Sequence, residues 1–411
     1  MKAKLFIFFI SLSFISGCNL NSEDIDREIN LTDKAAKLVE ADNEFGLELF
    51  QKVVAYEKEA GNIMVSPLSV SLALAMAYNG ANGETKTAME RALKLYGLSD
   101  DDINESYKTL VEALKSLDKK VLLEIANAIY YRDDFTVEPA FISVNQNYYD
   151  AAVSPLDFSD PGSVDVINGW VADKTRDKIT RILDEISADQ VMFLLNAVYF
   201  KGVWQKEFNS KSTVEYPFHL ENGEVKDVGM MCRLDTLDYL SNSLFKAIRL
   251  AYGKGNYNMY VFLPEEGKTV NNIIEQLNKA NWGAWMDGFR QTNSVDIKLP
   301  KFKFKYEIKL NDVLSDMGMG VAFSGAADFT GISKSGELSI DYVKHKTFVE
   351  VNEEGTEAAA VTVVAIELTS VGNEPQKIPF IVNKPFLFAI TEKDTGAILF
   401  MGKVVLPEYS G

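Results

Sequence analysis

Few side chains in this sequence are of the types that carry covalent chemistry. The histidines are His219 and His345, and the cysteines are Cys18 and Cys232. A histidine can act as a general base and a cysteine as a nucleophile, but each needs partner groups at a defined spacing. The patterns HExxH, CxxC and GxSxG, which supply such partners, do not occur in the sequence. We therefore predict that the protein is not an enzyme and has no metal site and no cofactor.

Residues 350–386 combine a strand-like centre with loop-like ends. The run AAAVTVVAI, from Ala358 to Ile366, is small, β-branched and uncharged, as in a strand buried inside a sheet. Its flanks are rich in Glu, Gly, Ser, Asn and Pro, as in exposed turns. On composition alone, an ordinary central strand between two loops explains this run. A second interpretation is a strand that is held outside its sheet and is able to insert.

The two faces of such a strand would differ in charge. Side chains alternate along a strand, so the even-numbered residues from Thr356 to Leu368 would share one face. Glu357 and Glu367 would lie on the other face. One face could therefore be buried in a sheet without burying a charge.

This segment resembles the hinge of the serpin family, which reads Glu-Glu-Gly-Thr-Glu followed by alanines. The resemblance covers about residues 44–407 and includes NIMVSPLSVSLALAMAYNGANGET (62–85), FKGVWQKEF (200–208) and VKHKTFVEV (343–351). Within the family, the chain is most similar to bacterial lipid-anchored inhibitory serpins of the miropin kind. The matching hinge residues are Glu353, Glu354, Gly355, Thr356, Glu357, Ala358, Ala359 and Ala360.

The resemblance implies an α+β serpin fold, with a mixed central β-sheet, further sheets and surrounding helices. No Pro, Gly or Ser-rich linker divides the chain after residue 30, so we expect one domain at 31–411 with an exposed reactive-centre loop at about 353–378. Ser66-Pro67 is a strong helix start, because serine caps a helix and proline tolerates its first turn. Further helices are predicted at 31–57 and 268–279, and strands at 121–131, 191–200, 245–252, 257–263 and 295–306.

The resemblance also implies two groups of residues that control the insertion of the loop. At the breach, where insertion would begin, Lys301 is expected to form a salt bridge with Glu353, and Trp204 is expected to pack nearby. Beneath the middle of the sheet, the family has a polar cluster called the shutter. Its expected members are Ser66, Ser69, Asn196 and His345.

In function, the resemblance implies a suicide inhibitor of serine endopeptidases, with cysteine endopeptidases as a further class left open. The expected reactive bond is Leu368-Thr369, since leucine fills an apolar specificity pocket, and Thr369-Ser370 is the alternative. Elastase-like, chymotrypsin-like and subtilisin-like proteases all have pockets that accept leucine. The competing interpretation is a non-inhibitory serpin-fold surface lipoprotein that acts as a binding module.

The N-terminus resembles that of a bacterial lipoprotein. Residues 1–17 have a basic start, an apolar run and small residues before Cys18, as in a signal peptide with a lipidation site. We expect lipid on Cys18, a flexible tether at 18–30 and an outer-membrane location, either periplasmic or cell-surface. Cys232 would then be left unpaired in a monomer.

The charge of the chain limits its partners. A net charge of −17 argues against nucleic acid, because the phosphate backbone requires a basic surface. One local exception is the alternation of Lys301, Lys303 and Lys305 with aromatic residues, which gives a strand with one charged face. A solvated strand and a polyanion site both fit this stripe.

Overall fold

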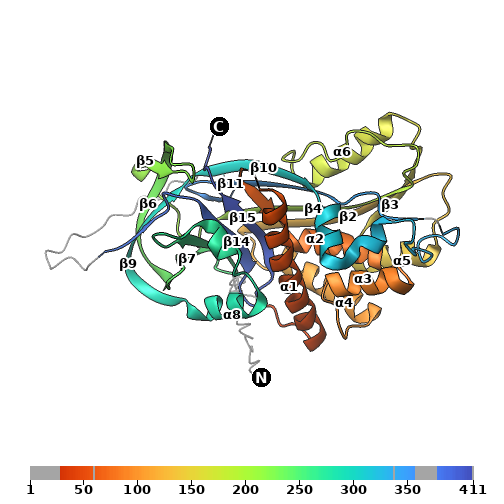
Figure 1. The fold of residues 1–411 in the computed structure, drawn as a ribbon, viewed down its shortest axis with the longest axis horizontal. Coiled ribbons are helices and arrows are strands. Elements are labelled where there is room, and N and C mark those ends of the chain that lie inside the picture. The colour runs from red at the N-terminus through yellow and green to blue at the C-terminus, as the bar shows by residue number, and fades with distance from the viewer. Residues whose placement is uncertain (1–27, 59–60, 337, 357–376, 410–411) are drawn as a thin grey trace, which may run out of the picture.

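The computed structural model of the protein describes residues 28–58, 61–336, 338–356 and 377–409. In these ranges, two sheets and a set of helices form an α+β fold with the expected mixed sheet, as the sequence predicts (Figure 1). No helix within the described ranges is long and apolar enough to cross a membrane.

The central sheet has six strands in the described part of the chain, in the spatial order β10-β11-β12-β4-β2-β3. The β2–β3 pair is parallel and the other neighbours are antiparallel, so the sheet is mixed. Its strands are β10 (Phe302–Lys309), β11 (Lys344–Val351), β12 (Gly355–Thr356), β4 (Met192–Val203), β2 (Val121–Arg132) and β3 (Ala152–Leu156).

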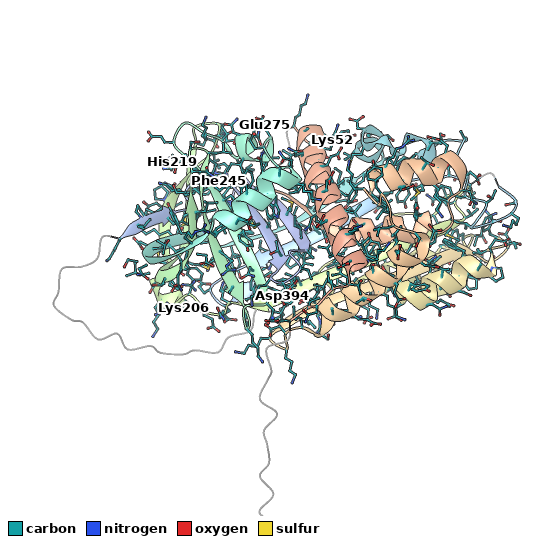
Figure 2. The ribbon with its side chains drawn as sticks, turned by 90° about the horizontal axis from the view of Figure 1, so that it is seen from below. Lys52, Lys206, His219, Phe245, Glu275 and Asp394 are labelled. Atoms are coloured by element: carbon teal, nitrogen blue, oxygen red, sulfur yellow. The ribbon has the colours of Figure 1, made fainter. Side chains whose placement is uncertain are left out.

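The second sheet has nine strands within the described residues, and β8, β14 and β15 are buried along their whole length. Figure 2 shows Phe245 of this sheet near the helix that contributes Trp285, and the two rings pack edge to face with centroids 4.9 Å apart. The strands are β1 (Ile63–Val65), β15 (Ile398–Val404), β14 (Phe386–Glu392), β8 (Tyr257–Pro264), β7 (Phe245–Tyr252), β6 (Val225–Ser241), β9 (Arg290–Pro300), β13 (Ile378–Ile381) and β5 (Val214–His219).

The helices lie on both sides of the central sheet. Helix α6 lies on one side, and α2 to α5 lie on the other (Figure 1). The helices are α1 (Asp33–Tyr56), α2 (Pro67–Tyr78), α3 (Gly83–Ala92), α4 (Asp100–Ser116), α5 (Pro139–Tyr149), α6 (Gly162–Lys174), α7 (Val270–Ile274), α8 (Lys279–Gly288) and α9 (Asn311–Leu314). Short helical segments occur at Ser210–Ser212, Ser315–Met319 and Gly320–Phe323.

Several predicted elements are confirmed, and one is wrong in extent. Helix α2 begins at Pro67, and the side chain of Ser66 accepts a hydrogen bond from the Ser69 amide, as predicted. The predicted helix at 268–279 is too long, because α7 ends at Ile274. A separate helix that the sequence did not predict, α8, begins at Lys279, and Asn278 caps it by accepting a hydrogen bond from the Asn281 amide at 2.9 Å.

Candidate functional site

The hinge begins inside the central sheet. The two residues of β12, Gly355 and Thr356, lie between β11 and β4 and pair with both strands. Thr356 lies opposite Val351 on one side and Gly202 on the other, and its side chain is buried. The chain therefore enters the sheet at the point where the sequence predicts that insertion starts.

Glycine is required at position 355 by the close approach of β4. A Cβ atom there would lie 2.0 Å from the carbonyl oxygen of Gly202 and 2.7 Å from the Cα of Val203. The residue also has a φ of +154°, which side chains disfavour. Both facts explain why the hinge carries glycine before Thr356.

A tight turn presents the hinge to β4. Asn352 accepts hydrogen bonds through its side-chain Oδ1 from the amides of Glu354, at 3.0 Å, and Gly355, at 3.3 Å. Such asparagine side chains stabilise turns by imitating a backbone carbonyl. Asn352 was not among the residues predicted from the sequence, although an asparagine directly before Glu-Glu-Gly is a recognisable turn signal.

Trp204, at the end of β4, holds this turn from the other side. Its backbone amide donates to the carbonyl of Glu354 at 2.7 Å, and its indole Nε1 donates to the carbonyl of Asn352 at 2.9 Å. The indole is buried and stacks on Tyr252 with ring centroids 4.4 Å apart. The hydroxyl of Tyr252 in turn lies 2.7 Å from the Thr356 Oγ1. Hydrogen bonds therefore connect the hinge to β4 of the central sheet and to β7 of the second sheet.

Glu353 has three polar contacts. Lys301 Nζ lies 3.3 Å from its carboxylate, which is the position that the family resemblance implies. Thr213 Oγ1 donates to the same carboxylate at 2.7 Å, and the Phe208 amide donates to the Glu353 carbonyl at 2.8 Å. The neighbouring Glu354 is different, because burial raises the pKa of its carboxyl, as do the nearby charges of Glu207 and Glu353.

Below the hinge, the central sheet is open. Strands β4 and β11 both pair with β12, but within the described residues no ladder joins β4 to β11 directly. Where one strand separates them, they lie two strand spacings apart, roughly 9–10 Å. A cavity of about 470 Å³ is lined by residues 191–198 of the β4 region, 342–346 of the β11 region and several residues of α2. The gap therefore lies where a further strand would fit.

The cavity corrects one prediction from the sequence. The run VMFLLNAVYF at 191–200 is almost wholly apolar, which predicts a strand buried on both faces, but Leu194, Leu195 and Val198 are only partly buried. These side chains line the cavity beside β4. No strand in the described part of the chain covers them there. The apolar composition of β4 suits a strand that gains a neighbour.

His345 occupies the middle of the sheet next to the start of α2. Its Nε2 accepts a hydrogen bond from the Ser66 amide at 3.0 Å, and burial lowers the pKa of the imidazole to about 4. The ring is therefore neutral near pH 7. His219 lies at the outer end of β5 and is exposed, so the two histidines serve no common site (Figure 2).

Asn196 is not joined to the other expected shutter residues. Its Nδ2 donates to Asn127 Oδ1 at 2.7 Å, and Asn127 Nδ2 donates to the Tyr149 carbonyl at 2.6 Å. No hydrogen bond in the described part of the chain links Asn196 to Ser66, Ser69 or His345. The physical reason is the gap, which keeps β4 away from β11. Asn196, Ser69 and His345 all line the cavity, and the buried Asn196 Oδ1 has no described partner.

Several predicted site residues lie outside the described residues. These are the hinge residues Glu357, Ala358, Ala359 and Ala360, the reactive-bond residues Leu368, Thr369 and Ser370, and Cys18.

The lysine stripe of β10 has carboxylate partners. Lys301 pairs with Glu353, and Lys303 Nζ lies 3.5 Å from Glu350, while Lys305 is exposed. Elsewhere in the described ranges, no group of three or more His, Cys, Asp or Glu side chains is arranged to hold a metal ion.

Comparison with known proteins identifies the class. The family model described as "Serpin (serine protease inhibitor)" matches residues 40–407, and this chain belongs to the serpin family. It is 36% identical over 377 residues to an uncharacterized serpin-like protein of Methanosarcina acetivorans, covering 90% of this chain and 86% of the relative. It is 31% identical over 408 residues to intracellular coagulation inhibitor 2 of Tachypleus tridentatus, covering 97% of each chain.

A solved structure supports the same fold. The native state of the thermophilic serpin tengpin matches with a TM-score of 0.82 and 34% sequence identity, covering 92% of this chain and 96% of that chain. The predicted serpin fold is therefore confirmed. The family takes its description from the inhibition of serine proteases.

Proposed function

We propose that this protein is a suicide inhibitor of serine endopeptidases, and that cysteine endopeptidases are a second class of target. The observation that carries the proposal is the position of the hinge. Gly355 and Thr356 already pair between β4 and β11, and the cavity of about 470 Å³ lies between the same two strand regions. A chain that continues from Thr356 along the sheet would fill this cavity.

The proposed reaction begins as ordinary proteolysis. The nucleophile of the protease attacks the carbonyl carbon of Leu368, and the bond from Leu368 to the nitrogen of Thr369 breaks. The amine of Thr369 leaves with a proton, and Leu368 remains joined to the protease as an acyl-enzyme. Water would normally release the protease. Here, the cut frees the loop, which inserts before water acts.

The register of β12 supports burial of the uncharged face. The Thr356 hydroxyl meets Tyr252 of the second sheet, so this side chain points into the interior. Because strand side chains alternate, the even-numbered residues after Thr356 would follow it inward, and Glu357 and Glu367 would point the other way. Insertion therefore requires no buried charge.

The length of the loop suits displacement of a protease. Gly355 and Leu368 are 13 positions apart, a separation that spans roughly 43 Å in an extended chain, at about 3.3 Å for each step. Full insertion would carry the attached protease towards the far end of the central sheet. We propose that its catalytic groups are distorted there, so that deacylation stops.

We further propose that the protein is anchored to the outer membrane through lipid on Cys18, as in inhibitory serpins of the miropin kind. The leader at 1–17 and the tether at 18–30 support this location. The described chain begins near Asp394, whose carboxylate accepts a hydrogen bond from the Ile29 amide at 3.0 Å (Figure 2). The tether would therefore leave the domain beside the turn between β14 and β15.

The test is incubation with elastase-like, chymotrypsin-like and subtilisin-like proteases, followed by a denaturing gel. We expect a band near the summed masses that survives boiling in detergent, and a released fragment that begins at Thr369. A fragment that begins at Ser370 would move the reactive bond by one residue. If every protease only clips the protein and keeps full activity, the inhibitor proposal fails and the binding module becomes the better interpretation.

A further inference from the structure

The last described residues, 408 and 409, lie beside the breach. After β15, the chain passes over the start of β10, where the Lys303 amide donates to the carbonyl of Glu408 at 2.7 Å. Figure 1 shows the last described part of the chain beside β10 and β11. This contact places the next residue, Tyr409, against the strand that leads into the hinge.

Tyr409 contacts three side chains at this point. Its hydroxyl donates to Glu350 Oε1 at 2.8 Å and accepts from Asn352 Nδ2 at 3.3 Å. Its ring lies 4.9 Å from Lys301 Nζ, within the range of a cation–π interaction. Hydrogen bonds to charged groups are among the stronger ones in proteins, so the bond to Glu350 fixes the position of the hydroxyl.

Two of these partners hold the hinge. Lys301 forms the ion pair with Glu353, and Asn352 accepts from the amides of Glu354 and Gly355. An asparagine amide has one oxygen and one NH₂ group. When Tyr409 holds the NH₂ group of Asn352, the oxygen faces the turn, which is the orientation that the hinge needs.

We propose that Tyr409 is a positioning residue for the hinge. It orients Asn352 and Lys301, and through them it holds the turn at 352–355 so that the uncut loop does not advance beyond Thr356. This inference rests on the proposed inhibitory function, because it assumes that the loop can insert. It gives the C-terminal segment a defined part in timing that insertion.

The first test measures the hinge itself and does not depend on inhibition. Hydrogen exchange, followed by mass spectrometry, should show faster exchange at the amides of Glu354 and Gly355 in Tyr409→Phe and Tyr409→Ala than in the wild type. The control is Tyr96→Phe, because Tyr96 is 61% exposed and lies on another part of the molecule. Unchanged exchange in both Tyr409 variants would overturn the proposal.

The second test measures premature insertion. The uncut proteins are incubated at one elevated temperature, and samples are assayed for trapping of a protease that the wild type traps. Tyr409→Ala should lose activity about tenfold faster than the wild type, and Tyr409→Phe should lie between them because it keeps the ring over Lys301. Loss at the wild-type rate in Tyr409→Ala would contradict the inference. A wild type that traps no protease would instead contradict the proposed function, and the exchange result would still decide the role of Tyr409.

Discussion

The top of the central sheet, at the breach, and its middle differ in what lies between the strands β11 and β4. At the top, the turn at 352–355 is held by Trp204 and Lys301, and Thr356 meets Tyr252. In the middle, the same two flanking strands border a cavity, and Asn196 Oδ1 is buried without a described partner. On the proposed mechanism, the breach would therefore resist insertion, and the cavity below it would receive the loop.

Filling the cavity with a strand would lower the free energy of the folded protein. A strand that fills the cavity would make about ten ladder hydrogen bonds, each contributing about 1 kcal/mol net. It would also cover the partly buried side chains of β4, such as Leu194 and Val198. The uncut protein is therefore expected to be held kinetically at the breach.

The largest expected effect tests whether the cavity is filled after cleavage. Limited proteolysis near Leu368 should raise the melting temperature by tens of degrees. Insertion should raise the free energy of unfolding by about 10 kcal/mol or more, and each kcal/mol raises the melting temperature of a domain of this size by roughly 2 °C. Scanning calorimetry of intact and cleaved protein measures the change. A cleaved form that melts at or below the intact form would mean that the cavity is not a site of insertion.

The second-largest effect is expected at Thr356, the last described residue before the cavity. In Thr356→Arg, a charge replaces a buried hydroxyl that meets Tyr252, at a cost of several kcal/mol when it is buried. The variant should fold yet be cleaved as a substrate, without a stable complex on a denaturing gel. Thr136→Arg, at an exposed loop position, is the matched control and should trap proteases normally. Normal trapping by Thr356→Arg would rule out insertion through Thr356.

A pH titration examines the middle of the sheet. Burial lowers the pKa of His345 to about 4, below its ordinary value of 6.5. The unfolded state therefore takes up a proton first as the pH falls, so stability is full above about pH 6.5 and is lost as the pH drops towards 4. The loss should reach about 3 kcal/mol, and His345→Gln should remove it. Denaturant unfolding at several pH values provides the measurement.

Asp42 must be replaced for this titration to be interpretable. Burial raises the pKa of its carboxyl to about 7, although the Tyr107 hydroxyl donates to it at 2.7 Å. Its folded pKa lies above the unfolded value, so its contribution has the opposite sign and is lost as the pH rises from about 4 through 7. The His345 comparison is therefore made in an Asp42→Asn background. If stability in that background does not fall between pH 6.5 and 4, the neutral, buried state of His345 is wrong.

The smallest effect is expected for the ion pair at the breach. Lys301→Met removes the ion pair with Glu353, but Glu353 keeps its hydrogen bond from Thr213. Partly exposed ion pairs contribute about 1 kcal/mol or less, so the melting temperature of the uncut protein should fall by roughly 2 °C or less. Lys94→Met, which breaks the similarly exposed pair with Glu48 of α1 and touches no residue of the breach, is the control. A much larger fall in Lys301→Met alone would make this ion pair the main restraint on the hinge.

The sequence by itself determined the features that depend on local pattern. The family follows from the unbroken hinge motif, and the start of α2 follows from Ser66-Pro67. Strands at 245–252 and 257–263 were predicted almost to the residue, since alternation and a buried apolar run are properties of neighbouring residues. Gly355 could be assigned to the hinge, although the sequence did not reveal which atoms exclude a side chain there.

Only the tertiary structure decided which distant residues meet. Asn196 pairs with Asn127 because β2 and β4 are neighbours, and it stays away from His345 because the cavity separates β4 from β11. Tyr409 reaches Asn352 because the end of the chain returns to the start of β10. Such contacts join residues more than fifty positions apart, and periodicity and composition carry information only about the local chain. The breach and the cavity are therefore products of strand order, which the folded chain alone establishes.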